Sequence, residues 1–197
     1  MGRRVTKNLQ RFVYDGYLQI ANFEQSAINS QLTTHNSQLF IWDPNEPVSA
    51  HPLGWECGEI ALCYAHDGNK NVSEVVSEDS EIVAHYEYAP FGAMMLASGV
   101  LWRDNTFRFS AEFYEGAIGL SYYNYRHYSP GHAKWLSRDR VEHKSDYLFV
   151  LNSVLNRVDL LGLEPATGAG TPLSEKRDCT YLLYVAHGSS DRAGNLW

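Results

Sequence analysis

Short runs of alternating apolar and polar residues recur in the first hundred positions of the chain. Three of them share one layout, in which a Tyr-containing segment, a turn with Gly and either Asp or Pro, and a second segment follow one another: 12–23, 62–76 and 84–95. Alternation with a period of two predicts half-buried strands, and a Gly-containing turn between two strands predicts a β-hairpin. The acidic run "SEDS" at 77–80 predicts a further turn between strands. The pattern therefore predicts a mainly β fold of antiparallel hairpins.

A more polar insert, 24–58, separates the first hairpin from the second. Its clearest apolar run is Leu39–Trp42, and the turn-forming sequence "DPNEP" follows that run directly. We expect one strand in this insert.

From Leu101 onwards the chain becomes dense in aromatic residues and arginine. Strands are expected at 107–114 and 119–128, around the turn "EGAIG", and a second turn is expected at Pro130-Gly131. The segment 145–158 has apolar residues at helical spacing but also the strand-like run "YLFVL", so a short helical or irregular piece is predicted. A Gly/Pro/Thr-rich linker follows at 164–170, and the tail holds one expected strand, Thr180–Ala186.

Composition and charge narrow the classes of function. The 197 residues are 44% hydrophobic, which indicates a folded core, and their net charge of -7 argues against a general attraction to nucleic acid. Neither an apolar run long enough to span a membrane nor a signal peptide is visible. Three cysteines in no zinc or redox spacing give no reason to expect a cofactor or a metal.

Several motifs together resemble the end of an RHS (YD-repeat) protein, including its repeat-associated core segment. The turns at Tyr14-Asp15, Tyr64–Gly68 and Tyr86–Gly92 resemble YD repeats, although Ala89 replaces the usual Asp of the third. The sequences "FRFSAEFYEGAIGLSYYNYRHYSP", "WLSRDR" and "NRVDLLGL" resemble the successive motifs of the core segment. The resemblance divides the chain into YD-like hairpins at 1–100, the core segment at 101–163 and a variable tail at 164–197.

The resemblance implies a β-sheet shell that the core segment closes, in proteins that are typically exported or found at the cell surface. It also implies autoproteolysis, in which two aspartates of the core cut the chain and release a variable segment, often a toxin of the polymorphic class. Carried onto this sequence, the aspartates are Asp139 and Asp159, with Arg138 in support, and the cut falls between Leu163 and Glu164. The partners implied are the chain's own C-terminal segment or the remainder of a larger shell.

Departures from the family motif leave a second interpretation open. The family's Asp-Pro-x-Gly appears here as "DRVE" and "DLLG", so both prolines and the first glycine are absent. Proline fixes φ and stiffens the turn that aims a carboxylate, so its loss can impair cleavage. The alternative is a structural or interaction module of YD hairpins with no chemistry. A metal site at His127, His132 and His143, and a function in the tail, are weaker possibilities.

Overall fold

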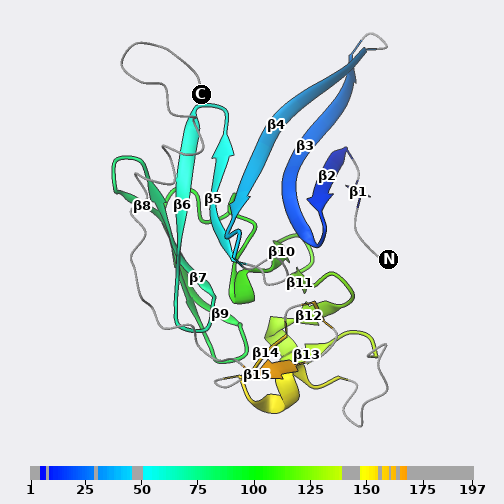
Figure 1. Ribbon diagram of the computed structural model, residues 1–197, viewed down its shortest axis with the longest axis vertical. Helices are drawn as coiled ribbons and strands as arrows, with labels where there is room; N and C mark the ends of the chain where they lie inside the picture. Colours follow the sequence, from blue (N-terminus) through cyan, green and yellow to red (C-terminus); the bar gives the residue numbers. More distant parts are fainter. Residues whose placement is uncertain are drawn as a thin grey trace.

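The computed structural model describes residues 5–7, 9–28, 31–45, 51–138, 147–154, 157–159, 161–162 and 165–167. A nine-stranded antiparallel sheet forms the larger part, with its strands side by side in chain order (Figure 1). These strands are β1 (Thr6–Lys7), β2 (Gln10–Asp15), β3 (Leu18–Ile28), β4 (Gln31–Trp42), β5 (Pro52–Cys57), β6 (Ile60–His66), β7 (Val72–Ser77), β8 (Ile82–Tyr88) and β9 (Met94–Ser98). The predicted mainly β, antiparallel fold is confirmed.

The nine-stranded sheet buries a row of large side chains on one face. The row comprises Phe12 of β2, Phe40 of β4, Trp55 of β5, Tyr64 of β6 and Tyr86 of β8, all of which are buried. Side chains of the following segment close this face, because the chain after β9 turns back over it. The ring of Phe107 meets that of Phe40 edge to face at 4.8 Å, and Phe113 meets Phe12 at 5.8 Å. Aromatic burial on this scale is a dominant stabilising term in a domain core.

A smaller four-stranded sheet carries the second core. Its strands are β10 (Phe113–Glu115), β11 (Leu120–Tyr122), β12 (His127–Ser129) and β13 (Lys134–Trp135), and the 3₁₀ turns around it are η1 (Phe109–Ala111), η2 (Pro130–His132) and η3 (Phe149–Asn152). Tyr128 lies at the centre of this core, with its ring 4.1 Å from that of Phe149 and 5.4 Å from that of Trp135. A final two-stranded sheet pairs β14 (Arg157–Asp159) with β15 (Pro165–Thr167).

The three hairpins expected from alternation are present as β2–β3, β6–β7 and β8–β9. The strand expected at Leu39–Trp42 is present as the end of β4, but the expectation that the insert holds only one strand was wrong. Strand β4 spans twelve residues and β5 is a further strand. Figure 1 shows the β3–β4 hairpin projecting beyond the rest of the sheet, where backbone pairing suffices and no aromatic row is needed.

The segment after Ser145 also departs from a helical pattern. Its described part contains the four-residue 3₁₀ turn η3, in which Val150, Leu151 and Asn152 have positive φ, and Leu148 forms a β-bridge with Lys134. The expectation of a linker was wrong for Pro165–Thr167, which pairs with β14. The tail strand expected at Thr180–Ala186 lies outside the described residues.

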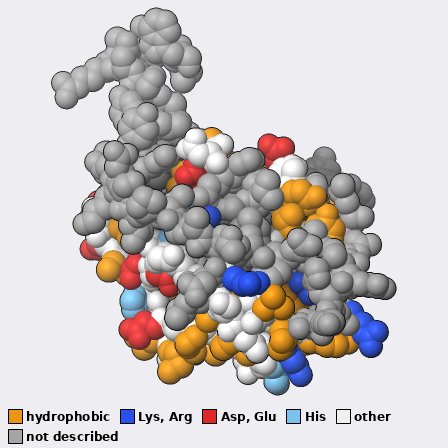
Figure 2. Space-filling view, turned by 60° about the horizontal axis from the view of Figure 1, so that its bottom comes forward, with side chains coloured by type: hydrophobic (Ala, Val, Ile, Leu, Met, Phe, Trp, Pro, Cys, Tyr) orange, Lys and Arg blue, Asp and Glu red, His pale blue; other side chains and the backbone are white. Residues whose placement is uncertain are grey.

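Edge strand β9 exposes several apolar side chains. Met95 is 70% exposed and Leu96 46%, and Val100 just beyond the strand is 82% exposed. Figure 2 shows hydrophobic side chains gathered along one border of the face that it draws. Exposed apolar edges favour pairing with further strands. None of the described helices is long or apolar enough to cross a membrane.

Candidate functional site

Of the site residues expected from the sequence, two can be placed. Asp159 ends β14 and is buried, with 3% of its surface exposed. Arg138 is exposed at the end of a described stretch. Asp139, Leu163 and Glu164 lie outside the described residues.

Asp159 begins a tight turn and holds that turn with its own carboxylate. Its Oδ1 accepts hydrogen bonds from the backbone N–H of Leu161 at 3.3 Å and of Gly162 at 2.6 Å. An aspartate that caps the next two or three residues in this way is a common turn former. Gly162 has a φ of +74°, a conformation that glycine adopts without strain. The Asp-x-x-Gly spacing noted in the sequence is thus the spacing of this turn.

Arg126 provides the opposite charge. Its Nη2 lies 3.1 Å from Asp159 Oδ2, its Nε donates to the Gly162 carbonyl at 2.6 Å, and its guanidinium lies 4.0 Å from the centre of the Trp135 ring. A hydrogen bond from Tyr123 N to Arg126 O, at 3.0 Å, closes the turn that carries the arginine between β11 and β12. Sequence reasoning placed this arginine in a family signature but missed it as the partner of Asp159.

Strands β14 and β15 bracket the expected cleavage point. Their register pairs Arg157 with Thr167, Val158 with Ala166 and Asp159 with Pro165. The five residues between the strands, 160–164, include the Leu163–Glu164 bond. The chain on the far side of that bond therefore returns alongside Asp159.

Glu112 carries a second buried carboxyl. Glu112 follows η1, is 6% exposed and lines a cavity of about 30 Å³ together with Gln19, Tyr122 and Asn124. Burial raises the pKa of Glu112 well above its ordinary value, and the charge of Asp159 raises it further. The sequence analysis missed this residue, and the signal was an acid within the apolar run "FRFSAEFY".

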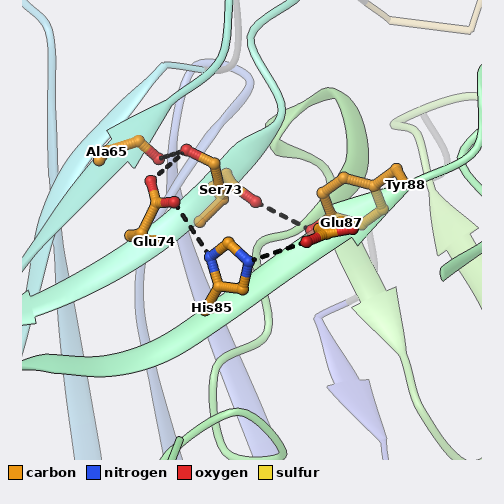
Figure 3. Close-up of polar contacts among 7 residues, drawn as sticks. Ala65, Ser73, Glu74, His85, Glu87 and Tyr88 are labelled. Carbon is orange, nitrogen blue, oxygen red and sulfur yellow. Dashed lines mark hydrogen bonds and ion pairs between the residues drawn. The ribbon is translucent and has the colours of Figure 1, made fainter. Parts of the chain in front are cut away.

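A polar cluster on strands β7 and β8 is separate from this site (Figure 3). His85 Nδ1 lies 3.0 Å from Glu74 Oε1, and its Nε2 lies 3.5 Å from Glu87 Oε1. Glu74 and His85 are direct partners across the two strands, so the contact is a cross-strand pair on a half-exposed surface. Among the residues described, no group of three or more His, Cys, Asp or Glu side chains could hold a metal ion, and His143 lies outside them.

Comparison with known proteins supports the fold. No protein-family model matches the chain, and no curated protein matches it by sequence. Solved structures do resemble it. The match to a TcdB2-TccC3-TEV crystal structure has a TM-score of 0.58 at 16% identity, and covers 78% of this chain and 9% of that one. The match to a Photorhabdus luminescens Tc holotoxin pore has a TM-score of 0.57 at 18% identity, and covers 80% of this chain and 9% of that one. The match to TcdB2-TccC3-Cdc42 has a TM-score of 0.56 at 20% identity, and covers 81% of this chain and 9% of that one.

These identities establish similarity of fold alone. They support a fold like that of part of the TcdB2-TccC3 chains, in keeping with the β-shell that the resemblance implies. The chain spans about 9% of the length of the solved chains that it matches.

Proposed function

We propose that the chain is an RHS repeat-associated core element of a larger β-shell, and that it cleaves itself between Leu163 and Glu164. One observation carries the proposal: the buried Asp159, paired with Arg126 at 3.1 Å, holds the turn that leads into this bond. A carboxylate in that position stands four positions before the peptide that it would cut. The partner of the reaction is the chain's own segment 164–197.

The shell role draws support from the two sheet edges. Strands β1 and β9 end the nine-stranded order, and each has a described partner on one side only. Further strands of the same kind would extend the sheet at either edge through backbone hydrogen bonds. The chain's small share of the TcdB2-TccC3 chains fits an element of a longer shell.

The chemistry requires carboxyl groups in two charge states. Arg126 and two backbone N–H groups stabilise the ionised form of Asp159, which suits it to accept a proton from an attacking water. Asp139 is proposed, from the sequence alone, as the second carboxylate of the site. Another group must hold a proton for the leaving nitrogen, because an amide nitrogen departs only after it is protonated. An intramolecular substrate needs no binding step, since the fold itself delivers the bond.

A second candidate is a structural module without chemistry. Both oxygens of Asp159 are engaged, Oδ1 by two backbone N–H groups and Oδ2 by Arg126. Those contacts by themselves explain why an aspartate stands at this position. In this case the turn joins β14 to β15 and nothing is cut.

Intact-mass spectrometry of the purified full chain separates the two candidates. Self-cleavage predicts two fragments that meet at Leu163–Glu164 in the wild type, and a single intact mass for Asp159→Asn. A single intact mass for both proteins would leave only the structural role. The same cut in both proteins would remove Asp159 from the chemistry.

A further inference from the structure

Arg108 is a buried cation without a counterion among the residues that the structure describes. It directly precedes η1 and is only 6% exposed, yet its guanidinium forms no ion pair with a described carboxylate. Arg126 is buried to a similar degree and does pair with a carboxylate, that of Asp159. Buried charges are normally paired, because a charge that leaves water without a partner is destabilising. The missing counterion of Arg108 therefore calls for a physical explanation.

Three hydrogen bonds fix the guanidinium of Arg108 but leave one of its nitrogens unused. Nε donates to the Asn105 carbonyl at 3.1 Å, and Nη2 donates to the carbonyls of Trp102 at 2.9 Å and Arg103 at 3.3 Å. No described group accepts a hydrogen bond from Nη1. The three carbonyl oxygens satisfy N–H groups but carry no net charge to offset that of the arginine. The side chain is thus held in place, with its positive charge and the N–H groups of Nη1 left over.

Arg108 lines a cavity of about 290 Å³ whose wall comes from both sheets. The large sheet contributes from β8 and β9, the small one from β10, and the turns η1 and η2 complete the wall with it: Tyr88, Met94, Phe109, Tyr114 and Pro130. The guanidinium carbon of Arg108 lies 4.7 Å from the centre of the Tyr114 ring. The volume is close to the lower end of the range for small-molecule sites, about 300–1,000 Å³.

Apart from Arg108, the described wall of this cavity is mainly aromatic and apolar. Tyr88, Phe109 and Tyr114 contribute rings, and none of the described lining residues is acidic. The hydroxyl of Tyr88 is already engaged, because it donates to the Val72 carbonyl at 2.9 Å. Apolar walls with a single fixed polar group are typical of sites in which the walls hold the body of a ligand and the polar group sets its orientation. Aromatic walls favour a ligand that carries a ring of its own.

We propose that this cavity binds a small carboxylate with an aromatic body. The carboxylate accepts hydrogen bonds from Arg108 Nη1 and supplies the missing negative charge, while the ring packs among Tyr88, Phe109 and Tyr114. A monoanion matches the single cation, whereas a phosphate dianion would leave a net negative charge in an apolar cavity. None of the described lining residues belongs to the turn at Asp159, so binding is independent of the proposed self-cleavage.

The test is isothermal titration calorimetry of the full chain with phenylacetate and with phenylacetamide, which share a shape and differ in charge. We expect saturable binding of phenylacetate, and binding of the amide that is weaker by about tenfold or more, because hydrogen bonds to a charged acceptor are the stronger ones. Acetate, which lacks the ring, should also bind less tightly than phenylacetate. Equal affinity for phenylacetate and the amide would overturn the inference. So would no saturable binding of phenylacetate, or tighter binding of inorganic phosphate.

Two variants locate the binding site. Arg108→Met removes the charge and should weaken phenylacetate binding by about tenfold or more. The matched control Arg103→Met removes an exposed guanidinium and should bind like the wild type. Unchanged affinity in Arg108→Met would overturn the inference.

Arg108 also holds three backbone carbonyls, so thermal unfolding must show that Arg108→Met is folded. Gly131→Trp leaves Arg108 untouched. Gly131 lines the cavity, and an added Cβ there meets no atom within 4 Å, so the indole has room and should weaken phenylacetate binding. If Arg108→Met does not fold, unchanged affinity in Gly131→Trp would overturn the inference instead.

Discussion

Arg126 Nη2 lies 3.1 Å from Asp159 Oδ2, and the two side chains are only 3% and 1% exposed. The pair joins the β11–β12 turn to the end of β14 across 33 positions of sequence. Removing one member of such a pair leaves the other charge buried and uncompensated, which is costlier than the pair itself is stabilising.

Arg126→Met is therefore expected to lower the free energy of unfolding by about 3–5 kcal/mol. Urea unfolding at pH 7 measures the change. The double variant Arg126→Met/Asp159→Asn should lose clearly less unfolding free energy than the sum of the losses in the two single variants, because no unpaired charge then remains. Arg103→Met is the matched control, since that exposed guanidinium lies 4.3 Å from the centre of the Trp102 ring. Its loss should cost less than about 1 kcal/mol.

Glu112 should make stability depend on pH. Its ordinary pKa is 4.5, and the folded protein raises it. Between the two values the unfolded chain is ionised while the folded one keeps its proton, so the free energy of unfolding falls as the pH rises. Each pKa unit corresponds to about 1.4 kcal/mol. Glu112→Gln should therefore be more stable than the wild type at pH 7, with the gap closing below about pH 4.5.

Urea unfolding curves at several pH values check this expectation. Glu78→Gln, in the exposed turn before β8, serves as the control and should show no comparable gain at pH 7. Equal stability of Glu112→Gln and the wild type across the whole pH range would contradict the raised pKa of Glu112 in the folded protein.

Gly162 is expected to tolerate no side chain. Its φ is +74°, and an added Cβ would lie 3.1 Å from the Cβ of Tyr123 and 3.4 Å from the backbone nitrogen of Arg126. Gly162→Ala should cost about 2 kcal/mol or more, from backbone strain and the close contact together. Gly16→Ala isolates the strain alone, because its φ is +54° with open space around it, and should cost about 1 kcal/mol. If Gly162→Ala and Gly16→Ala lower the free energy of unfolding equally, Tyr123 moves aside without an energetic penalty.

Asn105 should be a second sensitive position. Its side chain is buried, accepts from the Tyr64 hydroxyl at 2.9 Å and donates to the Phe107 carbonyl at 2.7 Å. Asn105→Ala leaves both groups unpaired in the core, so a loss of about 2–3 kcal/mol is expected from thermal or urea unfolding. Asn69→Ala, in the β6–β7 turn, should stay within about 0.5 kcal/mol. If both variants lose a similar amount of unfolding free energy, the hydrogen bonds of Asn105 are not the cause.

Part of this molecule could be predicted directly from the order of its residues. Alternation with a period of two is a local property, so the strands of the hairpins β2–β3, β6–β7 and β8–β9 could be located from it. The turn at Asp159 was visible for the same reason, because the aspartate and Gly162 act over three positions. The lengths of β3 and β4 were not visible, since a projecting hairpin is held by backbone pairing and needs few apolar side chains.

The sequence by itself determined the β class, the hairpin turns and the place of one site residue, Asp159, because each depends on neighbours along the chain. Only the tertiary structure decided what surrounds that residue. Arg126 and Glu112 precede it by 33 and 47 positions, and neither has a local pattern that points to it. Arg126 reaches Asp159 because the small sheet folds back over the aromatic face of the large one, and burial raises the pKa of Glu112.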